Sequence, residues 1–149
     1  MNRPVFENPS LENLLQVVPL YMEVFNSDPW SDGWSVEAAT ERMTSFAKYF
    51  EFFSMRILVG EVAIGFALGW AERWVKVWQF HLYEICVSPK MQGKAYGRVL
   101  HSELEKQTRE RGLTALFLQT DAQLPAHKFY EVCGYRDRAL TVMGKRHAD

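Results

Sequence analysis

The stretch that decides the fold reads Tyr83-Glu84-Ile85-Cys86-Val87-Ser88-Pro89-Lys90-Met91-Gln92-Gly93-Lys94-Ala95-Tyr96-Gly97-Arg98. Its first residues are apolar and β-branched, which is typical of a buried strand. Pro89 ends the strand, because proline lacks the N–H that a sheet ladder needs. A loop of small residues follows, and apolar positions then recur at helical spacing. A strand, a small-residue loop and a helix start direct several backbone N–H groups to one point. Such a point binds anions, phosphate above all.

The rest of the chain supplies strands and helices around this stretch. The predicted strands are Val5–Glu7, Phe52–Val59, Val62–Trp74, Val77–Val87, Ala115–Thr120 and Ala139–Gly144. The predicted helices are residues 11–25, kinked or split at Pro19, a second helix capped by Ser35, Tyr96–Arg111 and Pro125–Val132. The central helix is expected to expose Arg98, His101, Glu105, Lys106, Arg109 and Glu110.

This order of elements predicts a mixed α+β fold, with helices on both faces of a largely antiparallel sheet. The short connection makes Val77–Val87 antiparallel to the strand before it. The right-handed crossover rule makes Val77–Val87 and Ala115–Thr120 parallel neighbours. Gly65 and Gly69, inside a strand, indicate a bulge or bend.

Composition narrows the classes of function. The 149 residues predict one domain over 1–149, and the net charge of -1 gives no field for nucleic acid or an anionic membrane. No apolar run approaches the roughly 20 residues that span a bilayer, and the first residues lack the apolar core of a signal peptide. Cys86 and Cys133 lie in apolar surroundings and are predicted to be buried free thiols. These features favour a cytoplasmic protein without a zinc site.

The loop from Asn26 to Trp34 has two interpretations. It combines turn-forming residues with two tryptophans and two aspartates. It is either a surface loop held by aromatic packing, or a loop that faces a substrate, where aromatic rings give shape and acids attract a cation.

Three features together resemble the GNAT family, the GCN5-related N-acetyltransferases. The first is the strand ending at Ser88-Pro89. The second is the loop Gln92-Gly93-Lys94-Ala95-Tyr96-Gly97, similar to the family pattern Gln/Arg-x-x-Gly-x-Gly/Ala. The third is Ala126-His127-Lys128-Phe129-Tyr130-Glu131-Val132-Cys133-Gly134-Tyr135, which resembles Ala-x-x-Phe-Tyr-x-x-x-Gly-Phe/Tyr. With the matching order of elements, the resemblance covers nearly the whole chain and implies a GNAT-like splayed sheet.

One residue departs from the family pattern. Ala95 stands where the family usually has the first glycine of a pair. Alanine keeps the N–H but does not easily adopt a positive φ. Because Tyr96 and Gly97 already belong to the first helical turn, Ala95 is expected to have a negative φ.

The resemblance implies acetyl-CoA as the cofactor. The loop amides would hold its pyrophosphate, and its pantetheine arm would lie between splayed parallel strands that end near Val87 and Thr120, pairing with the backbone as an added strand does. The implied cofactor-binding residues are Ile85, Cys86, Val87, Gln92, Gly93, Lys94, Ala95, Tyr96, Gly97, Arg98, Thr120, Ala126 and Phe129.

Two residues are implied for proton transfer. Tyr130 matches the tyrosine proposed as the family's general acid, since a phenol is protonated at neutral pH. Glu84 is the candidate base, directly or through a water, or else it only holds the substrate ammonium; Asp121 and His127 are weaker alternatives. Strand alternation places Glu84 and Cys86 on one face and Tyr83, Ile85 and Val87 on the other.

The expected reaction is acetyl transfer from acetyl-CoA to a primary amine of a small cationic molecule or a peptide. Acidic and aromatic residues would meet this acceptor, namely Asp28, Trp30, Trp34 and Trp78. The alternative is a non-catalytic acyl-CoA-binding module of the same fold. By analogy with the family, a homodimer is possible, with the last strand pairing across a two-fold axis.

Overall fold

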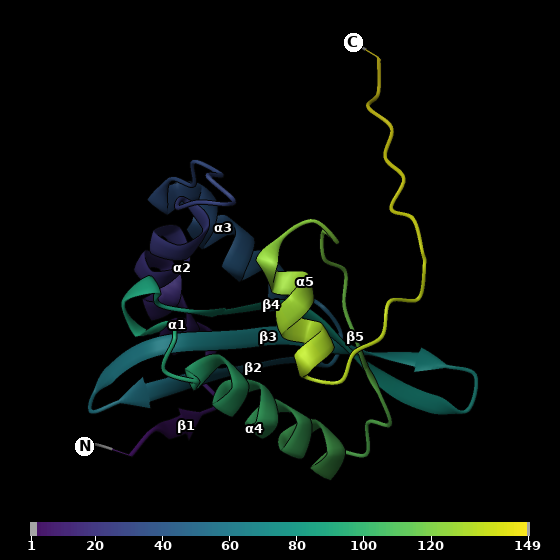
Figure 1. Ribbon diagram of the computed structural model, residues 1–149, viewed down its shortest axis with the longest axis horizontal. Coiled ribbons are helices and arrows are strands. Elements are labelled where there is room, and N and C mark those ends of the chain that lie inside the picture. Colours follow the sequence, from purple (N-terminus) through teal and green to yellow (C-terminus); the bar gives the residue numbers. More distant parts are fainter. Residues whose placement is uncertain (1–2, 149) are drawn as a thin grey trace. The chain divides into compact units, whose positions relative to one another are not determined.

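A five-stranded sheet organises the residues up to Gln119 (Figure 1). The computed structural model describes residues 3–148. The strands follow the sheet order β1-β2-β3-β4-β5 and are β1 (Val5–Glu7), β2 (Phe52–Val59), β3 (Val62–Trp74), β4 (Val77–Val87) and β5 (Leu116–Phe117). The first four pair antiparallel, and β4 pairs parallel with β5. The prediction of a mixed, mostly antiparallel sheet is therefore confirmed.

Two irregularities in the sheet lie beside the glycines of β3. The β2–β3 register shifts between Ile57 and Leu58, next to Gly65. The β3–β4 register shifts at Gly69, where an added Cβ would collide with the carbonyl oxygen of His81. The expected bulges are thus present, and at Gly69 the close approach of the next strand excludes any side chain.

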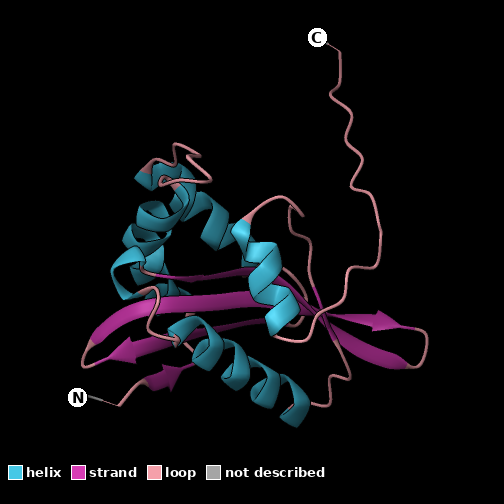
Figure 2. Ribbon diagram, viewed as in Figure 1, coloured by secondary structure: helices cyan, strands magenta, loops and turns pink. Residues whose placement is uncertain are grey.

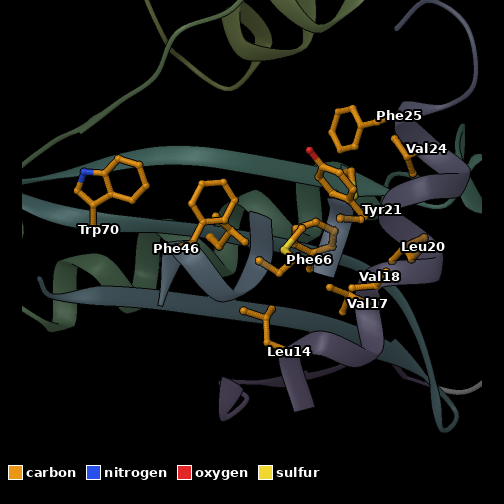
Figure 3. Close-up of a cluster of buried hydrophobic side chains, with 14 residues drawn as sticks. Leu14, Val17, Val18, Leu20, Tyr21, Val24, Phe25, Phe46, Phe66 and Trp70 are labelled. Atoms are coloured by element: carbon orange, nitrogen blue, oxygen red, sulfur yellow. The ribbon is translucent and has the colours of Figure 1, made fainter. Parts of the chain in front are cut away.

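Three helices cover one face of the sheet. The first predicted helix is split as expected into α1 (Leu11–Leu14), a 3₁₀ turn η1 (Leu15–Val17) and α2 (Val18–Phe25), with Pro19 in the first turn of α2. Helix α3 (Val36–Phe46) is capped by Ser35, whose hydroxyl accepts the Ala38 N–H at 3.1 Å. Their apolar side chains pack on Phe66 and Trp70 of β3 (Figure 3).

The opposite face is covered by α4 (Tyr96–Glu110), which packs on β2, β3 and β4. Its buried residues are Leu100, His101, Leu104 and Thr108. The prediction that His101 is solvent-exposed is wrong, because the imidazole lies on the same helical stripe as Leu104 and Thr108. Figure 2 shows β3 and β4 as a long hairpin closed by a tight turn after Trp74.

Residues from Thr120 onward form a second unit. It contains α5 (Pro125–Val132), which begins with proline as predicted and is followed by Gly134 with φ +97°. The predicted strand Ala139–Gly144 is wrong: within residues 135–148 no strand or helix is formed. The apolar residues Leu140, Val142 and Met143 gave the pattern of a strand, but their side chains are exposed. A strand also requires a neighbouring strand with which its backbone can form hydrogen bonds.

Among the helices of residues 3–148, none combines the length and the apolar character that crossing a membrane requires. Neither cysteine forms a disulfide within residues 3–148; Cys86 is buried as predicted, whereas Cys133 is half-buried.

Candidate functional site

A cavity of about 170 Å³ lies where β4 faces α3 and the segment after β5. Its lining residues are Arg42, His81, Leu82, Tyr83, Glu84 and Gln119. Most of these side chains are polar, and four of the six come from four consecutive positions of β4. The local geometry of β4 therefore determines what the cavity presents.

A bulge in β4 shapes the cavity wall. Leu68 is opposite Glu84 and Gly69 is opposite Leu82, so Tyr83 has no partner on β3. The Tyr83 ring contacts Phe46 of α3 at 5.1 Å, and Glu84 also faces the helices α2 and α3. Two consecutive residues thus point to the same face. The predicted alternation, which placed Tyr83 opposite to Glu84, is wrong because the bulge interrupts it.

Glu84 is held by two partners. Arg42 of α3 donates to its Oε1 from Nη2 at 2.7 Å and from Nε at 3.3 Å, and the Tyr21 hydroxyl donates to it at 3.3 Å. The Glu84 side chain is only 11 % exposed. This burial raises the pKa of Glu84, although its hydrogen bonds to Arg42 and Tyr21 oppose the shift. Burial and the Glu84 charge likewise raise the pKa of Tyr21.

Arg42 is fixed in turn by aromatic rings. Its guanidinium carbon lies 5.3 Å from the ring centre of Trp34, 4.9 Å from that of Phe46 and 5.5 Å from that of Tyr83. A guanidinium among aromatic rings is stabilised by their quadrupoles and cannot easily leave its carboxylate. The Glu84 charge is therefore already compensated within the protein.

The residues predicted to meet the acceptor are distributed over two places. Trp34 contacts Arg42 and donates its indole N–H to Asp32 at 3.1 Å. Trp30 packs on Phe25 at 5.2 Å, and Asp28 accepts the Ser31 hydroxyl at 3.1 Å. Trp78 lies toward the hairpin turn, with its ring 6.1 Å from that of Phe50. None of these four predicted residues lines the cavity, and only Trp34 contacts a residue that does.

The sequence analysis missed His81. Its Nδ1 lies 3.5 Å from Oε1 of Glu72, and its ring stacks on Phe117 at 4.5 Å. The same Glu72 oxygen accepts the Trp70 indole N–H at 3.0 Å. The tight turn after Trp74 pairs Trp70 with His81 and places Glu72 on their face. Counting residues from this turn would have paired Trp70 with His81, so the sequence did hold a signal for the group of Trp70, Glu72 and His81.

The loop between β4 and α4 has the geometry of an anion site. After the 3₁₀ turn η2 (Pro89–Met91), Gly93 has φ +76° and Ala95 has φ +66°. The first backbone bond of α4 runs from the Val99 N–H to the Ala95 carbonyl, so within residues 3–148 the amides of 93–98 have no backbone acceptor. Amides in alternating right- and left-handed conformations form concave anion sites. This loop therefore fits a phosphate-containing group.

Ala95 does not behave as predicted. Its backbone is left-handed, with φ +66° and ψ 8°, where a negative φ was expected. The reason is that α4 starts only at Tyr96, and Ala95 is the residue that turns the chain into the helix. Gln92 also differs from the rest of the loop, because its own N–H donates to the Pro89 carbonyl at 3.4 Å.

Within residues 3–148, the outer edge of β4 pairs with no strand beyond its pairing with β5. That pairing joins only Phe80 to Leu116 and His81 to Phe117. The Ser88 N–H donates to Ile64 of β3 at 2.7 Å, so by strand alternation the backbone groups of Val87 and Ile85 point away from β3. In agreement, the Val87 carbonyl accepts the Gln92 side chain at 3.3 Å. Cys86 instead directs its backbone toward β3 and buries its thiol.

The remaining predicted residues belong to the second unit. Thr120 is its first residue and is exposed, while Ala126, Phe129 and Tyr130 lie on α5. The Tyr130 ring meets Phe129 at 5.4 Å and Tyr135 at 5.6 Å, both edge-on. The Tyr135 N–H donates to the Tyr130 carbonyl at 3.0 Å, which fixes the turn that ends α5.

Comparison with known proteins identifies the family. A model of the acetyltransferase (GNAT) family matches residues 16–135. No curated protein gives a significant match. A V. cholerae integron cassette protein is 15% identical with a TM-score of 0.80, covering 98% of this chain and 93% of that one.

Two solved aminoglycoside acetyltransferases are similarly close. AAC(6')-Iy, solved with CoA, is 14% identical with a TM-score of 0.78, covering 99% of this chain and 97% of that one. Meta-AAC0020, from an uncultured soil metagenomic sample and solved with sisomicin, is 16% identical with a TM-score of 0.75, covering 98% and 97%. At these identities the likeness concerns the fold alone. Because the family model spans most of the sequence, the chain belongs to the GNAT acetyltransferase family.

Proposed function

We propose that this acetyltransferase moves an acetyl group from acetyl-CoA to a primary amine of a small cationic molecule or a peptide. The observation that carries the proposal is the loop of residues 93–98, whose amides have no backbone acceptor in the described chain and which begins next to the open edge of β4. The loop amides can bind phosphate oxygens, and the edge of β4 can pair with an extended arm that contains amides. CoA has both parts.

The residues present fit such a cofactor. The loop amides from Gly93 to Arg98 would hold the pyrophosphate, and the outward backbone groups of Ile85 and Val87 would pair with the pantetheine amides. Cys86, Gln92, Thr120, Ala126 and Phe129 complete the proposed set by family resemblance. The cofactor supplies an acyl thioester, which an amine can attack directly.

Two side chains serve proton transfer in this proposal. Tyr130 gives a proton to the departing sulfur, since its phenol occupies the position of the family's Phe-Tyr motif. Glu84 acts on the amine side, as the base or as the anchor of the ammonium. Its burial beside the cavity favours a role there, and its ion pair with Arg42 is the interaction that either role must loosen.

The acceptor is proposed to be an amine that aromatic and acidic groups recognise. The loop residues Asp28, Trp30 and Trp34, together with Trp78 of the β3–β4 hairpin, form its proposed contacts. The names of the two aminoglycoside acetyltransferases suggest an amino sugar as one acceptor to try, beside polyamines, amino acids and peptide amines.

The test is release of CoA thiol from acetyl-CoA with a panel of such amines. We expect turnover with at least one amine and a loss of about 10²-fold in kcat for Tyr130→Phe, which removes the acid. Binding of acetyl-CoA without turnover for any amine, together with no effect of Tyr130→Phe, would instead identify a non-catalytic acyl-CoA-binding module.

A further inference from the structure

Two residues that line the cavity, Glu84 and His81, each take part in an ion pair, but they differ in how readily they can accept a proton from a substrate. Glu84 is bound by the Arg42 guanidinium and by the Tyr21 hydroxyl. To take a proton it must weaken a 2.7 Å ion pair whose cation is held by three aromatic rings. The charge of that carboxylate is already compensated by Arg42, so it attracts a further cation poorly.

His81 has the opposite arrangement. Its Nδ1 faces Glu72 at 3.5 Å, and its side chain is only 12 % exposed although it lines the cavity. Its Nε2 has no hydrogen-bond partner among residues 3–148, and since no buried side-chain nitrogen or oxygen in that range lacks such a partner, Nε2 is accessible. One ring nitrogen therefore lies near a carboxylate, and the other is accessible on a residue that lines the cavity.

The imidazole is also held in place. Phe117 stacks on one side with an interplanar angle of 23°, and Trp70 meets the ring edge-on at 5.1 Å. The Glu72 carboxylate is fixed by the Trp70 indole at 3.0 Å. A carboxylate near Nδ1 stabilises the imidazolium, and an imidazole packed between aromatic rings needs little rearrangement when it takes up a proton.

We infer that His81, positioned by Glu72, is the general base that deprotonates the acceptor amine in this cavity. The inference rests on the proposed function and names the residue that performs its first step. Glu84 and Arg42 then form a neutral pair in the wall of the cavity. The charged and titratable groups around the imidazole are Glu72 of β3, Arg42 of α3, and Tyr83 and Glu84 of β4.

The step balances without any further reactant. His81 Nε2 takes one proton from the acceptor ammonium, which leaves a neutral amine. The nitrogen lone pair attacks the thioester carbonyl carbon, a C–N bond forms and the C–S bond breaks. The second amine proton ends on the CoA sulfur, delivered by Tyr130 in the proposed function. The products are the amide, CoA thiol and the proton on His81, which passes to water.

The experiment measures kcat against pH with saturating acetyl-CoA and the best amine of the panel. For His81→Ala we expect about a 10²-fold loss at pH 7, loss of the acidic limb of the profile, and partial recovery with added imidazole. Glu72→Gln should lower kcat about 10-fold and keep the limb, as expected of a positioning residue. Thermal melting and acetyl-CoA affinity of each variant report whether it is folded.

Glu84→Gln and His127→Gln test the competing bases. Both should keep the acidic limb. The inference is overturned if His81→Ala keeps the limb and responds to no imidazole, or if Glu84→Gln or His127→Gln removes the limb instead. Should His81→Ala fail to fold, His81→Gln replaces it, with the limb as the readout. Absence of turnover with every amine overturns the proposed function and this inference with it, whereas turnover with an unchanged limb overturns only the inference.

Discussion

Ala95 combines a left-handed backbone with a Cβ, and Gly93 has the same backbone hand without one. The left-handed conformation costs an L-residue about 1–2 kcal/mol of stability. Glycine avoids this cost, but it loses about 0.5–1 kcal/mol because its unfolded chain has more conformational entropy to give up. We predict that Ala95→Gly raises the free energy of unfolding by about 0.5 kcal/mol. Gly93→Ala, for which the new Cβ meets nothing within 4 Å, should lower it by about 1 kcal/mol.

Urea unfolding of both variants checks this pair of predictions. The opposite signs are the essential result, because both substitutions change one methyl group in an exposed loop. A stabilised Gly93→Ala variant would contradict the conformation assigned to the loop.

The second residue-scale prediction concerns Arg42 and Glu84. Arg42→Met leaves the buried carboxylate without its cation and should lower the free energy of unfolding by about 2–3 kcal/mol at pH 7. Adding Glu84→Gln removes that unpaired charge. The double variant should therefore be more stable than the sum of the two single losses by about 1–2 kcal/mol. A double-mutant cycle by chemical denaturation measures this coupling, and strict additivity would show that the pair contributes nothing.

At the scale of elements, α4 carries a histidine in its buried face. The His101 side chain is 3 % exposed, and this burial lowers its pKa, although Glu105 partly opposes the shift. The unfolded chain therefore binds more protons than the folded chain once the pH falls below about 6.5, the ordinary histidine value. The contribution of His101 to stability is complete above that pH and is lost as the pH falls.

This linkage gives a measurable slope. The free energy of unfolding should decrease between pH 7.5 and pH 5.5, and His101→Gln should flatten the decrease. His147→Gln, which changes an exposed histidine, should keep the wild-type slope. Urea unfolding at four pH values decides the matter, and an equal slope in all three proteins would mean that other groups cause it.

The elements also show which parts of the secondary structure can be predicted from sequence patterns alone. The strands β2, β3 and β4, the N-cap Ser35 and the helix start at Pro125 follow from local composition, and their predicted positions are confirmed. The last strand was predicted from an apolar pattern alone, but a ladder requires a partner edge, which pattern does not supply. β5 is only Leu116–Phe117, shorter than predicted, because β4 pairs with it at two positions only.

At the scale of the whole molecule, ligand binding and stability are coupled. If the loop holds the CoA phosphates, free CoA at 100 times its Kd should raise the free energy of unfolding by about 2.7 kcal/mol. Pantetheine, which lacks the pyrophosphate, should give a much smaller change at the same concentration. Thermal or chemical unfolding with each compound tests this, and equal effects of the two would show that the loop does not contribute.

The candidate site could be predicted from the sequence only in part, because some of its residues become neighbours only through tertiary packing. The anion-binding loop is contiguous, so its residues could be read directly. The cavity brings together α3, β4 and the end of β5, and its Glu72–His81 and Arg42–Glu84 pairs depend on strand register and helix docking. No spacing rule links Arg42 to Glu84, because tertiary packing alone makes them neighbours.

The extra residue in β4 also has a consequence for how this strand tolerates substitution. Before Tyr83, even-numbered side chains such as Phe80 and Leu82 are buried on the α4 side; after it, by alternation, that side receives Ile85 and Val87. In saturation mutagenesis of β4, sensitivity to polar substitution on the α4 side should fall on even-numbered positions before Tyr83 and on odd-numbered positions after it. Deleting Tyr83 would remove the extra residue and leave Glu84 and Cys86 on the side of α2 and α3, so this deletion should be better tolerated than a one-residue deletion elsewhere in β4.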